Sequence, residues 1–463
     1  MFIGRKQELK QLAEMYQSDQ FEFAVFYGRR RVGKTTLINE FCKNKKAIYF
    51  VGVESSEKEN LENFSKAVFE TAVPGIEMPA FGSADKLFDY IHVMAKQERI
   101  LLIIDEYPYF SQSSPSVSSI LQAHIDRKLK DTKLFLILCG SSMSFMEHQV
   151  LGYKSPLYGR RTAQFKIKPF TYSESCEMTD GFPDEEKAVI YGVTGGIPEY
   201  LSRVSNHLGL RDNIIRLFLD SSGRLFEEPS NLLKQELRDP FAYNAIITAI
   251  AGGASKLNEI ATKAGIETSA CSNHLTSLMA LGLVKKEIPI TESASRKTIY
   301  LLEDQMFRFW YRFVLPNMNS IVSGNGDKVY DHMVAPQLNA FMGLVFEEIC
   351  KQYLLEQFMI GKLPFFIGNI GRWWGNNPIL KRQEEIDILS FHADNALFGE
   401  CIWTSSPVDV SVLTDLLKQS LLFNYTNNYF YLFAKTDFTR QCIQFGKENS
   451  KIRLVTFAEI SNP

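Results

Sequence analysis

The chain has 463 residues, more than one hydrophobic core usually organises, and this length predicts roughly two to four domains. Its 51 Lys and Arg residues are balanced by 53 Asp and Glu residues, and the formal net charge of -2 excludes an overall basic field directed at nucleic acid or membrane. The seven cysteines form no CxxC pair, which argues against a zinc site or a disulfide framework.

The first residues, 1–16, have the pattern of an amphipathic helix rather than of an apolar signal segment. No run of about 18 apolar residues occurs along the chain. Together with the scattered cysteines, these features predict a soluble, cytoplasmic protein without a membrane partner.

Residues 21–104 alternate short apolar runs with helical stretches, in the order FAVFYG, LINEFC, AIYFVGV, a helix near residues 61–69, and ILLIID. A further apolar run, LFLILCGS, covers residues 134–141. This alternation is typical of parallel strands joined by crossover helices and predicts an α/β domain. Residues 174–237 then become mostly helical around a turn at residues 195–198, as in a helical lid.

Two further segments follow the helical stretch. Residues 244–302 have the pattern of three short helices and then a strand pair, KKEIPI and KTIYLL, which is the order of a winged helix-turn-helix. After Pro316 the pattern is a long helix, three strands, a helix, a strand, a helix and a strand, which predicts a second α/β unit. Its strands lie roughly at PFFIGNIG, EEIDILSF, ALFGECIW, YFYLFAK and IRLVTFA.

Residues 28–35, GRRRVGKT, match the pattern G-x-x-x-x-G-K-[ST] directly between an apolar strand and a helix. Glycines let consecutive backbone N–H groups curl around a phosphate, and the dipole of a helix N-terminus favours the anion. The pattern predicts an ATP or ADP site in which Lys34 reaches the β- and γ-phosphates and the Thr35 hydroxyl takes a Mg²⁺ position. The alternative is a chance match in a surface loop. The predicted nucleotide contacts of this segment are Gly28, Arg29, Arg30, Arg31, Val32, Gly33, Lys34, Thr35 and Thr36.

Residues 99–106 form an apolar strand that ends in two carboxylates, Asp105 and Glu106. Ligands of open parallel sheets bind at the carboxyl ends of the strands, so this pair is expected beside residues 28–35. Asp105 is predicted to hold Mg²⁺, and Glu106 to orient or deprotonate the attacking water as a catalytic group together with Lys34. A solvated turn after an ordinary strand is the alternative.

With these motifs the chain resembles, over essentially its whole length, the AAA+-like P-loop ATPases of the STAND group, and specifically the prokaryotic archaeal ATPase family with a DUF234-type C-terminal region. Residues 2–9, FIGRKQEL, resemble the family's box before the P-loop, which implies that Arg5 contacts the adenine region. Residues 158–161, YGRR, resemble its arginine motif, which implies that Arg160 acts as a phosphate sensor or as an arginine finger.

The resemblance implies two more pocket residues. Ser141-Ser142 occupies the sensor position after the fourth strand, which implies that Ser142 detects the γ-phosphate by direct contact. The turn at residues 196–198 resembles the family's lid turn, which implies that Pro198 takes part in nucleotide-dependent motion. A simpler interpretation stands beside each residue: Ser142 as a helix cap, Pro198 as a helix breaker, and Arg160 with its neighbour Arg161 as a surface pair.

DNA is a candidate partner because residues 269–278, SACSNHLTSL, have the polar outward pattern of a recognition helix. That helix contains no Lys or Arg, although phosphate neutralisation drives most nonspecific affinity for DNA. A protein contact or a spacer is the alternative. Residues 372–374, RWW, are a basic aromatic cluster that either stacks on nucleic acid or packs in a core. The predicted wing carries four cations, Lys285, Lys286, Arg296 and Lys297.

Glu347 on the long helix, Asp387 on one strand and Glu400 on the next have the order of the PD-(D/E)xK nucleases, whose acids hold a Mg²⁺ that activates water. The DUF234-type region resembles this nuclease fold. The position of the lysine is filled by Ile402, which cannot stabilise developing charge. Retention of the acids as structural hydrogen-bonding groups is the alternative. Lys418, on the helix that follows, is the candidate for a relocated lysine, and Lys381 or Arg382 is expected to supply charge before the strand.

The predicted architecture is an α/β P-loop parallel-sheet ATPase core at residues 1–172, a helical lid at 173–238, a winged helix-turn-helix at 239–315 and a restriction-endonuclease-like α/β domain at 316–463. The leading hypothesis is a STAND/AAA+-like switch that binds and hydrolyses ATP with Mg²⁺, acts on or near DNA, and forms nucleotide-dependent homo-oligomers. Two alternatives stay open: an ATP-gated signalling or assembly scaffold whose C-terminal domains bind protein, and a Mg²⁺-dependent nuclease driven by ATP.

Overall fold

The computed structural model describes residues 2–237, 239–293, 297–378 and 381–461. The chain divides into two compact units. The first comprises Met1–Phe170 together with Ile197–Glu199, and the second comprises Thr171–Gly196 together with Tyr200–Pro463. The segments predicted as lid, winged helix and C-terminal domain therefore cluster together, apart from three residues of the lid turn.

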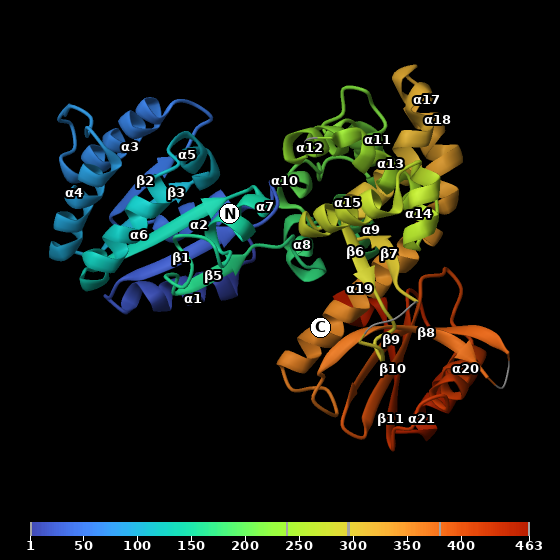
Figure 1. The fold of residues 1–463 in the computed structure, drawn as a ribbon. Helices are drawn as coiled ribbons and strands as arrows, with labels where there is room; N and C mark the ends of the chain where they lie inside the picture. The colour runs from blue at the N-terminus through green and yellow to red at the C-terminus, as the bar shows by residue number, and fades with distance from the viewer. Residues whose placement is uncertain (1, 238, 294–296, 379–380, 462–463) are drawn as a thin grey trace. The chain divides into compact units, whose positions relative to one another are not determined.

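The first unit is built on a five-stranded, fully parallel sheet in the order β2-β3-β4-β1-β5 (Figure 1). Every residue of β3 and β4 is buried, as expected for strands that helices cover on both faces. The continuous apolar runs of the sequence are therefore the central strands, and the predicted parallel α/β core is confirmed. The strands are β1 (Glu22–Tyr27), β2 (Ala47–Val51), β3 (Ile100–Asp105), β4 (Leu134–Gly140) and β5 (Ala163–Lys166).

Helices connect these strands. The N-caps of α3 and α4 are Ser56 and Ser83, whose side chains accept hydrogen bonds from backbone amides of the first turn. By contrast, α2 follows the loop of residues 28–33, and its N-cap residue, Gly33, has no side chain that could accept a hydrogen bond from the first turn. The helices are α1 (Lys6–Gln17), α2 (Lys34–Cys42), α3 (Glu57–Ala72), α4 (Ala84–Gln97), α5 (Tyr107–Ser113), α6 (Val117–Arg127), η1 (Leu129–Asp131), α7 (Met143–Phe145) and η2 (Met146–Val150).

The second unit begins with helices and continues with three helices and an antiparallel hairpin, β6–β7, in the order that the sequence predicts for residues 239–315. The first group contains α8 (Tyr172–Met178), α9 (Asp184–Thr194), α11 (Leu210–Phe218) and α12 (Glu228–Glu236), and the short α10 (Pro198–Leu201) begins in the first unit and ends in the second. The second contains α13 (Pro240–Ala251), α14 (Leu257–Ala264), α15 (Thr268–Ala280), β6 (Val284–Glu287) and β7 (Ile299–Leu302).

Short helices then lead to a mixed sheet in the order β12-β11-β10-β9-β8, in which β8, β9 and β10 are antiparallel neighbours and β10, β11 and β12 are parallel. The short helices are α16 (Gln305–Phe309), η3 (Trp310–Val314), η4 (Leu315–Asn317), α17 (Met318–Val322), α18 (Gly326–Val329), η5 (Tyr330–Val334) and η6 (Ala335–Gln337). The sheet and its helices are α19 (Leu338–Met359), β8 (Asn369–Asn377), β9 (Arg382–His392), β10 (Asn395–Ile402), α20 (Val410–Ser420), β11 (Asn427–Ala434), α21 (Arg440–Glu448), β12 (Ile452–Thr456) and α22 (Phe457–Ser461).

The first strand of this sheet starts later than the run PFFIGNIG predicts. Both phenylalanines lie in the loop before β8: Phe365 stacks on Tyr429 with ring centroids 5.6 Å apart, and Phe366, which is 59% exposed, meets Phe358 edge-on. Within the strand, Trp373 is only 8% exposed and belongs to the core formed with α20 and α21. Core packing, rather than an exposed nucleic-acid cluster, is therefore the correct interpretation of that tryptophan.

The helices of the described residues are short or carry charged side chains along their length. None of the helices there combines the length and the apolar character needed to cross a membrane.

Candidate nucleotide site

The loop of residues 28–33 follows β1 with unusual backbone angles. Gly28, Arg31 and Gly33 have φ values of 155°, 71° and 88°, in the region that favours glycine. A Cβ on Gly28 would lie 2.3 Å from the carbonyl oxygen of Ile167, so no larger residue fits there. The loop can therefore bend closely over the end of β1 and present the N-terminus of α2 to an anion.

Lys34 opens α2 and is 7% exposed. Its Nζ donates to the carbonyl oxygens of Gly28 at 2.7 Å and Arg29 at 3.0 Å, so the ammonium group lies across the loop. This is the place in which a phosphate would meet it. The other predicted loop contacts differ in exposure: Arg29, Arg30, Arg31 and Gly33 are half-buried, Val32 is buried, and Thr35 and Thr36 are exposed on the first turn of α2.

Two arginines tie the loop to its surroundings. Arg30 donates to the hydroxyl of Tyr109 on α5 at 3.0 Å. Arg5, which is 6% exposed, donates to the carbonyl oxygen of Val32 at 3.1 Å and lies 4.8 Å from the ring centroid of Phe170. Arg5 thus supports the loop, while the contact with adenine implied by the family resemblance stays a prediction.

Asp105 ends β3 and receives three hydrogen bonds, as predicted for an acid beside the loop. Thr35 Oγ1 donates to its Oδ2 at 2.9 Å, the Tyr49 hydroxyl donates to the same oxygen at 2.8 Å, and the Glu106 amide donates to Oδ1 at 2.9 Å. The two residues predicted to hold Mg²⁺ therefore already touch. Their hydroxyl and carboxylate oxygens are the ligands that a hard divalent cation prefers.

Glu106 is a non-glycine residue with φ 46°, in the left-handed region. Such conformations cost roughly 1 kcal/mol or more and cluster at functional sites. The Ser141 hydroxyl at the end of β4 donates to Glu106 Oε2 at 3.0 Å. Because β4 lies between β1 and β3, the sensor position faces both the loop and the acids. This contact is made by Ser141 and not by Ser142. Ser142 is the N-cap residue of α7, but its side chain forms no capping hydrogen bond there. The predicted role of Ser142 at the γ-phosphate stays a prediction.

Pro198 lies at the loop as well. Its Cγ is 3.8 Å from the place that a Cβ on Gly33 would take, and Ile197–Glu199 cluster with the first unit. The lid turn that the sequence predicts is therefore in contact with the phosphate loop. Its role in nucleotide-dependent motion stays a prediction.

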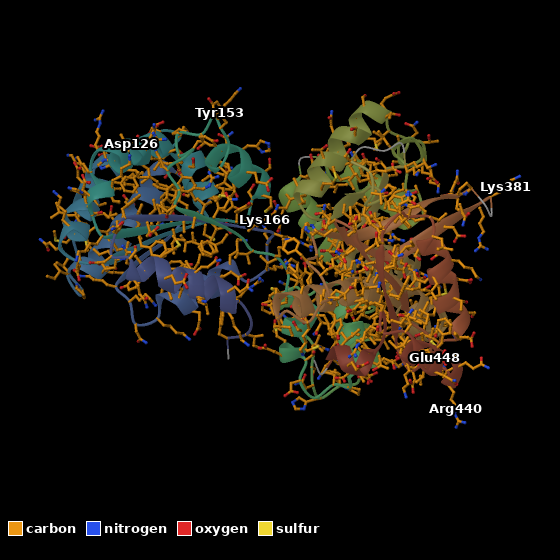
Figure 2. All side chains as sticks on the ribbon, turned by 90° about the horizontal axis from the view of Figure 1, so that it is seen from below. Asp126, Tyr153, Lys166, Lys381, Arg440 and Glu448 are labelled. Carbon is orange, nitrogen blue, oxygen red and sulfur yellow. The ribbon has the colours of Figure 1, made fainter. Side chains whose placement is uncertain are left out.

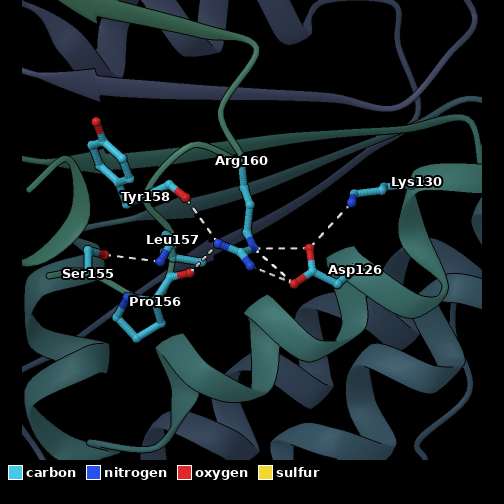
Figure 3. A network of polar contacts seen from close by, with 7 residues as sticks. All are labelled: Asp126, Lys130, Ser155, Pro156, Leu157, Tyr158 and Arg160. Atoms are coloured by element: carbon cyan, nitrogen blue, oxygen red, sulfur yellow. Dashed lines mark hydrogen bonds and ion pairs between the residues drawn. The ribbon is translucent and has the colours of Figure 1, made fainter. Parts of the chain in front are cut away.

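Arg160 lies at the end of the sheet where the strands begin, away from the phosphate loop at their carboxyl ends. Its guanidinium donates to both oxygens of Asp126 on α6, at 2.6 to 3.1 Å, and to the carbonyl oxygens of Pro156 and Tyr158 (Figure 3). It precedes β5, whose first residue pairs with Ala24 near the start of β1. The phosphate loop follows the other end of β1, a strand of 6 residues that spans about 20 Å. Arg160 is thus not part of its own chain's phosphate site.

The surface around Arg160 is aromatic. Tyr153 is 83% exposed and extends away from the ribbon (Figure 2), and its ring lies 5.3 Å from that of Tyr158 in an edge-on contact.

The acids of the C-terminal sheet come together. Burial, with the nearby Asp387 carboxylate, raises the pKa of Glu347 to about 7 and that of Glu400 to about 9, and burial also raises the pKa of Asp387. The Cys401 amide donates to Asp387 Oδ2 at 3.0 Å. Among the described residues, no group of three or more His, Cys, Asp or Glu side chains is arranged to hold a metal ion. The second metal site predicted at these acids stays a prediction.

The cations predicted to serve the C-terminal site and DNA have other partners. Lys418 pairs with Asp415 at 2.9 Å and Arg382 with Glu384 at 2.8 Å, so neither replaces the missing lysine in this conformation. Lys381 lies at the tip of the β8–β9 hairpin (Figure 2), and Lys286 on β6 is exposed. Arg296 lies outside the described residues. The remaining hairpin cations form two ion pairs, Lys285 with Glu287 and Lys297 with Glu292.

Tyr49 is a site residue that the motifs do not indicate. Because Tyr49 lies within the apolar run AIYFV, the sequence predicts only that it packs in a strand. The pairing of β2 with β3 is what brings its hydroxyl to Asp105. Burial and the adjacent carboxylate raise the pKa of the hydroxyl, which therefore stays protonated and keeps donating.

If Asp105 holds Mg²⁺ during ATP hydrolysis, as the motifs predict, replacing Tyr49 by Phe raises the Mg²⁺ concentration needed for half-maximal turnover by roughly tenfold, because hydrogen bonds that orient a metal-binding carboxylate typically matter by that factor. The kcat at saturating Mg²⁺ should change less. Tyr90→Phe, which removes a hydroxyl from a ring packed on Phe69, is the control. An unchanged Mg²⁺ dependence in the Tyr49 variant would contradict the positioning role.

A parallel sheet with a glycine-containing phosphate loop after β1 and an acid pair after β3 defines a P-loop ATPase domain. Residues 2–204 match the family described as an ATPase domain predominantly from Archaea. Residues 310–413 match DUF234, described as Archaea bacterial proteins of unknown function.

Three individual proteins are similar to this chain in sequence or in fold. An uncharacterised protein of Methanocaldococcus jannaschii is 36% identical over 407 residues, which cover 87% of this chain and 88% of that protein. An uncharacterised ATP-binding protein of the same organism is 48% identical over 46 residues, or 10% of this chain and 78% of that protein. A Walker-type ATPase of Pyrococcus abyssi has a similar fold, with a TM-score of 0.51 at 18% identity over 67% of this chain and 96% of that one. The chain belongs to the archaeal ATPase family and carries a DUF234 region.

Proposed function

We propose that the chain binds ATP with Mg²⁺, hydrolyses it, and works as a nucleotide-driven switch of the STAND/AAA+-like type. The observation that carries this proposal is the contact of Thr35 with Asp105 at 2.9 Å, immediately before Glu106 and beside the phosphate loop. In P-loop nucleotide hydrolases a hydroxyl and a carboxylate hold Mg²⁺, and a further residue orients the attacking water. Thr35, Asp105 and Glu106 supply these three groups.

Each residue has a separate task in this proposal. Lys34 exchanges the carbonyl oxygens of Gly28 and Arg29 for phosphate oxygens, which are stronger acceptors because they carry charge. Thr35 and Asp105 would hold Mg²⁺, which would supply positive charge against the phosphates. Glu106 accepts a hydrogen bond from the attacking water, and polarises it, once its carboxylate leaves the Ser141 hydroxyl.

The contact between Ser141 and Glu106 also supports a switch. While Ser141 holds the carboxylate, Glu106 is a poor base because one of its oxygens is already engaged. Movement of Ser141 towards the γ-phosphate would release it. The turn at Pro198, which packs beside Gly33, gives the lid region a path by which it senses the same event.

The place of Arg160 supports action between copies of the chain. From the amino-terminal edge of the sheet its side chain, roughly 7 Å long, cannot span the length of β1 to the phosphates of its own chain. A second copy that docks its phosphate face on this edge would bring a nucleotide to Arg160. Asp126 would then give up the guanidinium to the stronger, more highly charged acceptor.

Arg160→Ala is expected to lower ATP turnover at least about tenfold at protein concentrations where copies associate, by analogy with the loss of one charge-stabilising donor. Mixing this variant with a Lys34→Ala variant should restore part of the activity, because each copy supplies what the other lacks. Arg161→Ala is the control. Failure of the mixture to exceed the sum of its parts, with turnover per chain independent of concentration, would contradict action in trans.

For the output, two observations favour the signalling or assembly scaffold over DNA. Lys285 and Lys297 on the hairpin are engaged by Glu287 and Glu292, and α15 presents no Lys or Arg. We therefore expect no DNA retention in a gel-shift assay at about 50 mM salt with ATP or ADP present. Binding that falls steeply as salt rises would instead favour the DNA hypothesis.

A further inference from the structure

Arg372 lies on the edge strand of the C-terminal sheet, at an irregularity of the pairing. The register between β8 and β9 shifts between Gly371 and Trp373. Between the pairs that these two residues form, β8 has one residue, Arg372, and β9 has two, Ile388 and Asp387, so the extra residue lies on β9 and the alternation of β8 is unbroken. While Trp373 enters the core against α20, the Arg372 side chain, only 14% exposed, lies among acids.

Three carboxylates from three different elements surround its guanidinium. Nε is 3.4 Å from Glu347 Oε2 on α19, Nη1 is 3.6 Å from Glu287 Oε2 on β6, and Nη2 forms an ion pair with Glu385 on β9. Glu287 and Glu347 are themselves 17% and 11% exposed. One cation thus serves two largely buried acids, which would otherwise repel each other at high cost, and the more exposed Glu385.

Arg372 acts on two of the three acids of the PD-(D/E)xK order, because its positive charge counteracts the rise in the pKa of both Glu347 and Asp387. Glu347 belongs to that order and contacts Arg372 directly. The lysine of the pattern is replaced by Ile402, and a second cation, Lys351, lies 3.9 Å from Glu347. The residues present therefore fit an internal guanidinium better than a metal ion, because positive charge is already supplied from within the chain.

The same strand is fastened to the β6–β7 hairpin in two more ways. The Ile290 amide, in the loop after β6, donates to the carbonyl oxygen of Arg372 at 3.0 Å. The Ile290 side chain packs against the core of the C-terminal sheet, and its Cδ1 lies 3.3 Å from where a Cβ on Gly371 would be. Side chain and backbone of Arg372 thus reach the same hairpin.

We propose that the Arg372 guanidinium is the resident cation of the C-terminal acid cluster, in the place of a divalent metal, and that through Glu287 it clamps the β6–β7 hairpin to the C-terminal sheet. The planar, permanently charged fork of arginine suits several carboxylates at once, which a lysine ammonium does not. The acids, on this proposal, are a structural lock between two parts of the chain and not a nuclease centre.

The first test counts bound Mn²⁺ on the nucleotide-free full chain by electron paramagnetic resonance of the free ion. Wild type and Asp387→Asn should bind equally, because the cluster holds no metal in either. Arg372→Gln should gain one site with at least about tenfold higher affinity than wild type shows there, and Arg372→Gln combined with Asp387→Asn should lose it. Mn²⁺ binding by wild type that Asp387→Asn removes would overturn the proposal, as would an Arg372→Gln protein that gains no site.

The second test addresses the clamp and stands on its own if Arg372→Gln does not fold. Glu287→Gln should increase the rate of amide hydrogen exchange in the peptide that spans residues 284–292 at least about fivefold, because the side-chain tie between hairpin and sheet is lost. Lys286→Gln, which changes an exposed neighbour on the same strand, is the matched control. Equal exchange in the Glu287 and Lys286 variants would overturn the clamp.

Discussion

Lys34→Ala is expected to weaken the binding of ATP and of ADP by at least roughly 100-fold. The ammonium is buried, so no other mobile cation at the surface can take its place, and removing one partner of a desolvated charge pair typically costs about 2 to 5 kcal/mol. Titration of a fluorescent ATP analogue, with and without Mg²⁺, measures the loss. Turnover should disappear with binding.

Lys43→Ala is the matched control for this prediction. Lys43 follows the other end of α2, where it is 65% exposed and pairs with Glu40 at 2.6 Å. A surface pair of this kind contributes little, so the control should bind nucleotide as the wild type does. Circular dichroism and a thermal melt verify that the Lys34 variant folds, because it also loses two hydrogen bonds to loop carbonyls. A folded variant that retained nucleotide affinity would remove the basis of the proposed function.

Much of the first unit can be predicted from sequence because its signals are local. The central strands are buried on both faces, so they appear as unbroken apolar runs, and the loop pattern specifies its own context of strand and helix. The contact between Thr35 and Asp105 follows from those two facts, since all strands of a parallel sheet end at the same edge.

The residues that sequence reasoning missed depend on strand register and on contacts between elements far apart in the chain. Tyr49 reaches Asp105 only because Val51 pairs with Asp105 and places the tyrosine two residues earlier on the same face. Arg372 meets acids from three separate elements, α19, β6 and β9, which no local residue pattern brings together. The position of Arg160 required knowing where β5 begins beside β1.

Glu106→Gln is expected to leave ATP affinity within about twofold of wild type and to lower kcat by roughly 100- to 10,000-fold, the range of a lost general base. Glutamine keeps the size of the side chain and can still accept the hydrogen bond from Ser141, but its amide is far too weak a base to polarise water. Asp105, Thr35 and Lys34 remain, so nucleotide binding should persist.

Two further variants separate this role from a structural one. Glu98→Gln, at a 50% exposed carboxylate that ends α4, should hydrolyse ATP at the wild-type rate. Ser141→Ala should bind ATP and alter turnover less than Glu106→Gln, because it removes the restraint on the base and leaves the base itself. Since glutamine inherits the same left-handed backbone, the strain at this position is common to wild type and variant. A difference in kcat between them therefore reports the carboxylate, and an unchanged kcat would mean that another group activates the water.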